Sequence, residues 1–176
     1  MLLPWRPVRP ISNTFGPPIN TSLTDNNARD LGWLATNARV LEIGTAYGFS
    51  TIVMANVATK VVTIDPHITH ASLPIIKFNL EVYGVKDKVD VKVGTSQEWC
   101  PQLELESFDL AFIDGDHTGP GVWHDVKWAQ RLVKKGGYIA CHDYGEDTCP
   151  EIQPTLDTLY PKGPERLVDT LFVVKQ

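Results

Sequence analysis

The sequence is poor in cysteine and has no clustered basic residues, and each deficit argues against a class of protein. Its 176 residues include three cysteines, an odd number without the spacing of a metal-binding motif. Reduced thiols in an intracellular protein therefore fit better than a disulfide framework. The net charge is -5 and no basic stripe is present, which argues against nucleic acid as a partner because non-specific binding needs clustered cations.

Long apolar runs are also missing. A membrane-spanning helix needs about 20 consecutive apolar residues, and the sequence nowhere provides them. The first ten residues contain no apolar run long enough for a signal peptide. We therefore expect a soluble, cytoplasmic protein with no membrane partner, and a hydrophobic content of 43% is enough for the core of one domain.

The beginning of the chain is rich in proline, with five prolines among the first 20 residues. Proline disfavours helix, so residues 1–22 are expected to form an extended arm or lid, followed by a single domain over residues 23–176. Trp5 lies in this arm. It could cover a substrate pocket or dock on a partner subunit, as in a homodimer, and the sequence leaves both roles open.

Beyond the arm, short apolar runs alternate with helical patterns. A helix is expected over residues 23–34, with Thr24 or Asp25 as its cap. Strands are expected at residues 40–43, 61–64, 89–93, 110–113 and 138–141, with helices at residues 51–58, 72–83, 97–103 and 121–133. This alternation predicts an α/β fold, with a doubly wound and mostly parallel sheet. Two final runs, at residues 165–168 and 171–175, are only two residues apart and predict an antiparallel C-terminal hairpin.

A glycine loop follows the first expected core strand. Residues 42–51 read EIGTAYGFST, in which Gly44 and Gly48 let the backbone turn sharply and approach a ligand. Their Gly-x-x-x-Gly spacing differs from the Gly-x-Gly-x-x-Gly of dinucleotide folds. Glu42 would repel a phosphate but suits a cationic ligand, such as one with amino and sulfonium groups. Asp65 ends the next strand, where a carboxylate can accept hydrogen bonds from both hydroxyls of a ribose.

Titratable residues follow two further strands. Asp114, Asp116 and His117 come after the run at residues 108–113, and His142 and Asp143 come after the run at residues 137–141. The carboxyl ends of parallel strands share one edge of a sheet, which is where ligands bind in such folds. We therefore expect the two clusters to face each other, and their carboxylates could hold Mg²⁺.

The segments LEIGTAYGFS and VGTSQEW, in this order, resemble the class I S-adenosylmethionine-dependent methyltransferases, and in particular the catechol O-methyltransferase branch. The resemblance covers residues 40–144 and implies a seven-stranded, Rossmann-like sheet. It makes S-adenosylmethionine the expected cofactor. The candidate cofactor-binding residues are Glu42, Gly44, Thr45, Ala46, Tyr47, Gly48, Ser50, Asp65, Thr95, Ser96, Gln97 and Asp114. Several have ordinary alternatives: the two glycines could form only a tight turn, and Asp65 or Ser96 could only cap a helix.

The IDGDH and HDY segments resemble a broad group of class I methyltransferases, some of which act on sugar hydroxyls. That resemblance places Asp114 and Asp143 on the metal ligands of metal-dependent O-methyltransferases, and His117 on the general base of sugar methyltransferases. These three residues are the candidate catalytic residues. The chain departs from the catechol type at Tyr144, which replaces a carboxamide. A third metal ligand is then missing unless His142, Asp116 or water supplies it, and His117 could instead only order its loop.

The expected function is O-methylation of a small-molecule hydroxyl, on a sugar, phenol or natural product, with the acceptor oxygen activated through Mg²⁺ or by His117. Two alternatives are a cofactor-binding but non-catalytic subunit and a nicotinamide-dependent oxidoreductase. The sequence does not identify the methyl acceptor, because substrate preference depends on the arm and loops.

Overall fold

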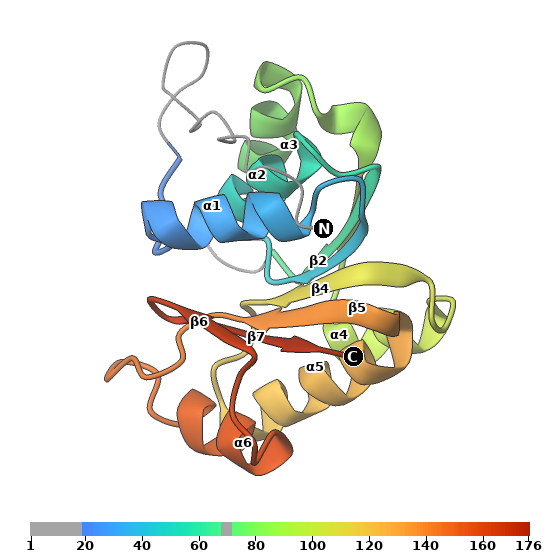
Figure 1. Ribbon diagram of the computed structural model, residues 1–176. Coiled ribbons are helices and arrows are strands. Elements are labelled where there is room, and N and C mark those ends of the chain that lie inside the picture. Colours follow the sequence, from blue (N-terminus) through green and yellow to red (C-terminus); the bar gives the residue numbers. More distant parts are fainter. Residues whose placement is uncertain (1–18, 68–71) are drawn as a thin grey trace.

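A seven-stranded sheet forms the centre of the structure, a computed structural model that describes residues 19–67 and 72–176 (Figure 1). Its strands are β1 (Arg39–Ile43), β2 (Lys60–Asp65), β3 (Val89–Val93), β4 (Phe108–Ile113), β5 (Val133–Cys141), β6 (Arg166–Val168) and β7 (Leu171–Lys175). They lie in the order β3-β2-β1-β4-β5-β7-β6. The first five run parallel, whereas β7 is antiparallel to both β5 and β6. The predicted α/β fold with an antiparallel C-terminal pair is confirmed.

Helices cover both faces of this sheet. They are α1 (Asp25–Leu34), α2 (Phe49–Ala55), α3 (Ser72–Val82), α4 (Ser96–Trp99), α5 (Gly119–Leu132) and α6 (Ile152–Leu159), with two short 3₁₀ turns, η1 (Lys86–Lys88) and η2 (Cys100–Gln102). Two hydrophobic clusters fill the two spaces between sheet and helices: α1, α2 and α3 pack on one face, and α5 and α6 on the other (Figure 1). The sheet is therefore doubly wound, as predicted.

Polar side chains fix where several helices begin. Thr24 caps α1 by accepting a hydrogen bond from the backbone N–H of Asn27, whose side chain accepts one from the N–H of Thr24. Thr118 caps α5, because its Oγ1 accepts a hydrogen bond from the backbone N–H of Gly121. The first of these caps confirms a sequence prediction. The proline-rich arm predicted for residues 1–22 lies mostly outside the described residues.

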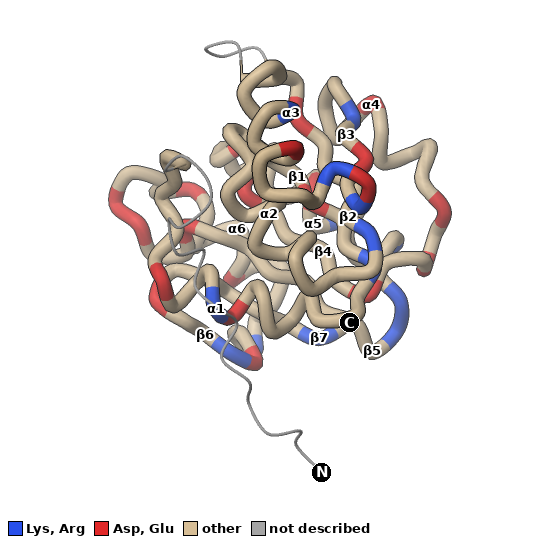
Figure 2. The backbone as a smooth tube through the Cα atoms, turned by 90° about the horizontal axis from the view of Figure 1, so that it is seen from above, with Lys and Arg blue, Asp and Glu red and all other residues tan. Residues whose placement is uncertain are grey.

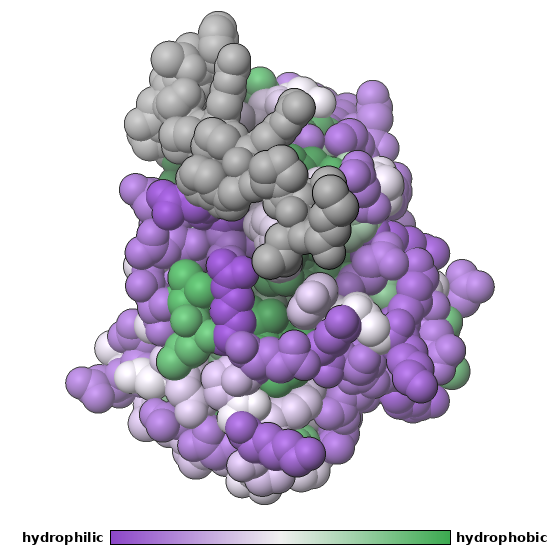
Figure 3. Space-filling view, viewed as in Figure 1, coloured by the Kyte–Doolittle hydropathy of each residue, from purple (hydrophilic) through white to green (hydrophobic). Residues whose placement is uncertain are grey.

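The exterior of the described chain is largely hydrophilic. On the face seen in Figure 3, hydrophilic residues predominate, and hydrophobic residues gather mainly near the centre of the view. Acidic and basic segments are interspersed along the backbone (Figure 2). Within the described ranges, no helix combines the length and the apolar character needed to cross a membrane.

The order of the strands places a candidate site at one edge of the sheet. β1 pairs with β2 on one side and with β4 on the other. The sheet therefore grows from β1 toward one edge through β2 and β3, and toward the other edge through β4 and β5. Backbone hydrogen bonds tie the loops that follow: Asp114 N donates to Ile43 O at 2.8 Å, and His142 N donates to Ile113 O at 3.0 Å. Open α/β sheets bind ligands at the carboxyl ends of strands at such a switch point.

Candidate functional site

The glycine loop lies directly against the end of β4. Gly44 has a φ of +94°, and a Cβ at this position would lie 2.0 Å from the backbone oxygen of Asp114. Gly48 is the N-cap residue of α2 with a φ of +88°, and a Cβ there would meet Ile76 at 3.0 Å. Glycine is required at both positions because other residues rarely adopt this φ, and at Gly44 a side chain would also collide with the backbone. The two glycines do form a tight turn, and that turn brings the loop to Asp114.

Asp65 holds this loop in place. Its Oδ2 accepts hydrogen bonds from the backbone N–H groups of Thr45 and Ala46, both at 2.9 Å, and its Oδ1 accepts one from His67 N at 2.6 Å. The loop needs this support, because Ala46 has a φ of +45°, which is unfavourable for a residue with a side chain. The Asp65 side chain remains 17% exposed. The structure therefore joins two segments that were predicted separately to contact the cofactor.

Glu42 lies beneath the loop and has no exposed surface. Its carboxylate accepts hydrogen bonds from Ser50 Oγ at 2.6 Å, Thr51 Oγ1 at 2.5 Å and Thr63 Oγ1 at 2.6 Å. Burial raises the pKa of Glu42 to about 7, although the three hydroxyl groups partly oppose this rise. Three hydroxyl groups therefore surround the oxygens of Glu42, and its predicted role toward the cofactor stays a prediction.

The third predicted cofactor segment begins α4. Thr95 is the N-cap residue of this short helix, with its Oγ1 accepting from Glu98 N, so the cap is Thr95 and not Ser96. Ser96 instead donates its hydroxyl proton to Asp125 Oδ1 at 2.5 Å, and its Oγ also lies 3.1 Å from Gln97 Oε1. Burial raises the pKa of Asp125 to about 6.

Asp125 was not predicted as a site residue, although the sequence carried a signal for it. It lies on α5 with 2% exposure, beside the buried residues Val122, Val126 and Ala129. An acid within an otherwise apolar helical stripe needs a polar partner, because an unpaired buried carboxylate is costly. Its bond to Ser96 thus connects α5 to the segment after β3.

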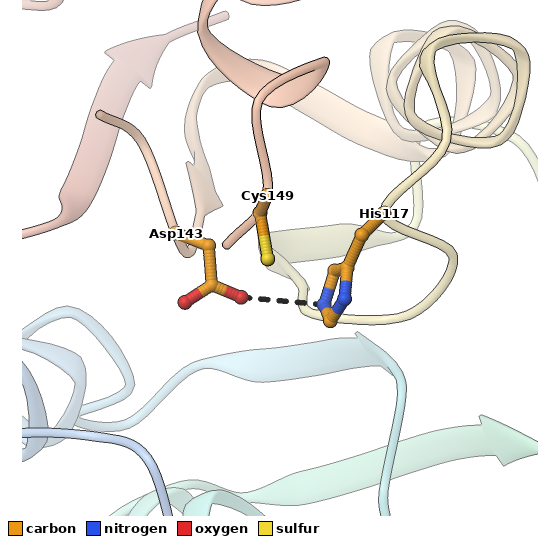
Figure 4. A group of neighbouring side chains, drawn as sticks. All are labelled: His117, Asp143 and Cys149. Carbon is orange, nitrogen blue, oxygen red and sulfur yellow. Dashed lines mark ion pairs between the residues drawn. The ribbon is translucent and has the colours of Figure 1, made fainter. Parts of the chain in front are cut away.

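The two predicted titratable segments do face each other across β4 and β5. His117 Nε2 lies 3.2 Å from Asp143 Oδ2 and 3.6 Å from Asp114 Oδ1. His142 Nδ1 lies 2.9 Å from Asp143 Oδ1 and 3.4 Å from Asp114 Oδ1. Figure 4 shows the His117 ring and the Asp143 carboxylate pointing toward one another, with the sulfur of Cys149 beside them. Two carboxylates and two imidazoles therefore form one cluster.

Mutual attraction sets the charges in this cluster. Burial alone would raise the pKa of Asp114, but His117 and His142 outweigh it and hold this pKa at about 2. Burial opposes a charge on His142 as well, but Asp114 and Asp143 raise its pKa to about 9. The pKa of His117 is also raised, chiefly by its hydrogen bond with Asp114. The imidazolium forms of the histidines thus balance the carboxylates.

The residues around Asp114 and Asp143 add few ligands for the expected Mg²⁺. The hydroxyl of Tyr144 donates to Asp157 Oδ1 at 2.8 Å and its ring packs on Phe172, so Tyr144 supplies no ligand. Asp116 Oδ1 instead accepts a hydrogen bond from Thr118 N at 2.9 Å. Asp114 and Asp143 thus supply two carboxylates, and the other positions of an octahedral Mg²⁺ would fall to water or substrate oxygens. The magnesium site at Asp114 and Asp143 stays a prediction.

Cys149 is the residue of this cluster that sequence reasoning missed. It lies in the loop between β5 and α6, is partly exposed, and brings its Sγ within 4.8 Å of ligand atoms on His117 and Asp143. In the sequence it follows Asp143 by six residues, a spacing typical of no known motif. Its position depends on the path of the loop, which no local pattern in the sequence predicts.

Comparison with known proteins identifies the family of the chain. The family described as "Methyltransferase domain" matches residues 41–144, which is more than half of the chain. A catechol O-methyltransferase from Mycobacterium tuberculosis is 41% identical over 104 residues, which cover 57% of this chain and 46% of that protein. The chain spans about half the length of the curated relatives it matches.

Solved structures share the fold. A cofactor-bound protein from MTB, Rv0187, has 31% identity and a TM-score of 0.68, over 78% of this chain and 68% of that one. An O-methyltransferase from Bacillus cereus, solved in complex with SAH, has 23% identity and a TM-score of 0.69, over 88% of this chain and 82% of that one. Together with the strand order and the glycine loop, these matches show that the chain belongs to the methyltransferase domain family, within the class I S-adenosylmethionine-dependent methyltransferases.

Proposed function

We propose that this protein transfers a methyl group from S-adenosylmethionine to a hydroxyl group of a small molecule. One observation carries the proposal: the glycine loop and the cluster of Asp114, His117 and Asp143 meet at the carboxyl ends of β1 and β4, where Gly44 lies against Asp114. A donor bound at the loop would therefore lie next to groups that can activate an acceptor. The names of the relatives, several of them O-methyltransferases, support the same reaction.

The cofactor would bind over the glycine loop. Asp65 is partly exposed, and the three backbone N–H groups that it binds leave about one of its four lone-pair sites for a ribose hydroxyl. Glu42, when ionised, gives a negative charge beneath the loop that attracts the amino and sulfonium groups. The segment from Thr95 to Gln97 would lie along the adenine. In this proposal Glu42 attracts and Asp65 positions the cofactor.

The acceptor would be activated by His117. Its side chain is 45% exposed, so it can reach a ligand, while Asp114 and Asp143 orient the ring and stabilise its protonated form. His117 first releases its proton to solvent, and the neutral ring then accepts the hydroxyl proton as the acceptor oxygen attacks the methyl carbon. The new C–O bond forms as the C–S bond breaks, and S-adenosylhomocysteine leaves. No step in this scheme requires Mg²⁺.

Several finer points belong to the same proposal. The acceptor is a phenol, a sugar or another natural product with a free hydroxyl. Cys100, Cys141 and Cys149 are free thiols, and a reducing compartment such as the cytoplasm preserves free thiols. A homodimer stays a prediction, as does the arm over residues 1–22. The relatives favour neither a non-catalytic subunit nor a nicotinamide-dependent enzyme.

Calorimetry with S-adenosylhomocysteine tests the cofactor site. Asp65→Asn keeps an oxygen for the loop amides but removes the charge that binds the ribose hydroxyl. We expect the affinity to fall by roughly tenfold or more, since a hydrogen bond to a charged group contributes about 1.5–3 kcal/mol. The control is Asp87→Asn, at an exposed residue of η1, which should leave the affinity unchanged. Equal affinities for wild type and Asp65→Asn would contradict the proposed site.

A further inference from the structure

His117, Asp143 and Cys149 bring three different metal-binding atoms to one place. Each comes from a different part of the loops at this edge of the sheet, and their ligand atoms all lie within 4.8 Å of one another (Figure 4). The set contains an imidazole nitrogen, a carboxylate oxygen and a thiol sulfur. The loop after β5 thus turns back toward the loop after β4.

The separations suit a tetrahedral ion. Zinc binds imidazole and carboxylate at about 2.0–2.1 Å, so two such ligands in a tetrahedron lie roughly 3.4 Å apart. His117 Nε2 and Asp143 Oδ2 are 3.2 Å apart without any rearrangement. A Zn–S bond is about 2.3 Å long, so a sulfur ligand lies roughly 3.6 Å from the other two ligands, and the Cys149 sulfur lies within 4.8 Å of both atoms.

The neighbours of these ligands are also suitable. Asp143 directs Oδ1 toward His142 Nδ1, which leaves Oδ2 for a cation, and His142 Nε2 in turn lies 3.2 Å from Thr170 Oγ1. Partners of this kind orient metal ligands. The backbone of Cys149 is fixed on both sides: its N–H donates to Glu146 O at 3.0 Å, and its carbonyl accepts from Ile152 N at 3.2 Å.

The chemistry of the donors determines which ion fits. Thiolate and imidazole favour borderline metals such as Zn²⁺ and Co²⁺, whereas Mg²⁺ selects oxygen. We propose that His117, Asp143 and Cys149 form a binding site for a borderline divalent cation such as Zn²⁺, in preference to Mg²⁺. Three protein ligands leave the fourth tetrahedral position open.

The proposal has a consequence that rests on the proposed function. Metal binding uses the lone pair of His117 Nε2, so the imidazolium proton and the thiol proton of Cys149 are both released to solvent. His117 is then unable to accept the proton of an acceptor hydroxyl. Zn²⁺ should therefore inhibit methyl transfer, and a chelator should restore it.

Cobalt titration of the full chain, after chelator treatment, tests the site directly. Co²⁺ bound to this set should give the strong visible absorption of a tetrahedral ion and a near-ultraviolet band from thiolate-to-metal charge transfer. Zn²⁺ should abolish both, whereas a large excess of Mg²⁺ should not. Cys149→Ser should lose the near-ultraviolet band and bind Co²⁺ roughly tenfold or more weakly. Asp147→Asn, at an exposed acid of the same loop, is the matched control and should behave as wild type.

Several results would overturn the metal site. These are the absence of Co²⁺ binding, a near-ultraviolet band that persists in Cys149→Ser, and displacement of Co²⁺ by Mg²⁺. Methyl transfer by chelator-treated protein, measured in parallel, separates the two proposals. If transfer occurs and Co²⁺ does not bind, the metal site is wrong and the enzymatic function stands. If Co²⁺ binds as described and no acceptor is methylated, the function fails and the metal site stands.

Discussion

The buried carboxyl group of Glu42 should make the stability of the protein depend on pH in a way that one substitution removes. The pKa of Glu42 rises from 4.5 to about 7 on folding. Between these values the folded chain holds a proton that the unfolded chain has released. This group therefore stabilises the fold fully below pH 4.5, and its contribution is lost as the pH rises to about 7.

The size of the effect follows from the shift. One pKa unit corresponds to about 1.36 kcal/mol, so the rise of Glu42 to about 7 amounts to about 3 kcal/mol. Glu42→Gln keeps the shape of the side chain and cannot ionise, and the three neighbouring hydroxyl groups can reorient toward an amide. Relative to wild type, this variant should therefore gain about 3 kcal/mol in free energy of unfolding between pH 4.5 and pH 8.

Urea unfolding of both proteins at several pH values measures this difference. Other groups titrate equally in wild type and variant, so subtracting the two profiles isolates Glu42. The same substitution at Glu104, whose side chain is 77% exposed, is the control and should leave the pH profile unchanged. Parallel profiles for wild type and Glu42→Gln would refute the argument, because they would mean that Glu42 is ionised at neutral pH without cost.

Two further substitutions test the packing around the site. Gly44→Ala combines an unfavourable φ with a Cβ 2.0 Å from a backbone oxygen, and it should lower the free energy of unfolding by about 3 kcal/mol or more. Gly84 also has a positive φ, of +69°, but a Cβ there would meet no atom within 4 Å. Gly84→Ala should therefore lower the free energy of unfolding by only about 1 kcal/mol. Equal losses in urea unfolding would show that the close approach to β4 is absent. Arg166→Met removes the ion-pair partner of Asp30, whose side chain is 3% exposed. The free energy of unfolding should fall by about 2 kcal/mol, which is less than for a fully buried pair because solvent screens the half-exposed Arg166. Adding Asp30→Asn should recover part of this loss in thermal unfolding, and no recovery would mean that the lost contacts of Arg166 matter more than its charge.

Much of the fold could be predicted because its signals are local. Buried parallel strands read as short apolar runs, and their alternation with helices restricts the topology to a few arrangements. The helix α6 was missed. It has only eight residues, and Pro154 in its first turn interrupts the helical pattern. The start of β5 at Val133 was also missed, because Gly136 and Gly137 disfavour a strand and only pairing with β4 extends it.

The candidate site was predictable where it depends on strand ends. Asp114 and Asp143 each follow a parallel strand, so the sheet itself brings them together. The direction of the Tyr144 side chain was not predictable, since its contacts with Asp157 and Phe172 come from distant segments. The same holds for Cys149, which only the path of its loop brings to the cluster. The hydroxyl groups that surround Glu42 likewise come from two other elements, α2 and β2.

Transfer of a labelled methyl group from S-adenosylmethionine is the measurement that tests the central claim most directly. Chelator-treated wild-type protein should methylate at least one compound in a panel of phenols, sugars and hydroxylated natural products. His117→Gln should bind S-adenosylhomocysteine with nearly unchanged affinity, because His117 lies outside the glycine loop, and should lose most of the transfer rate. Transfer by His117→Gln at the wild-type rate would contradict the assigned base. Cofactor binding without transfer to any hydroxyl compound would contradict the proposed reaction.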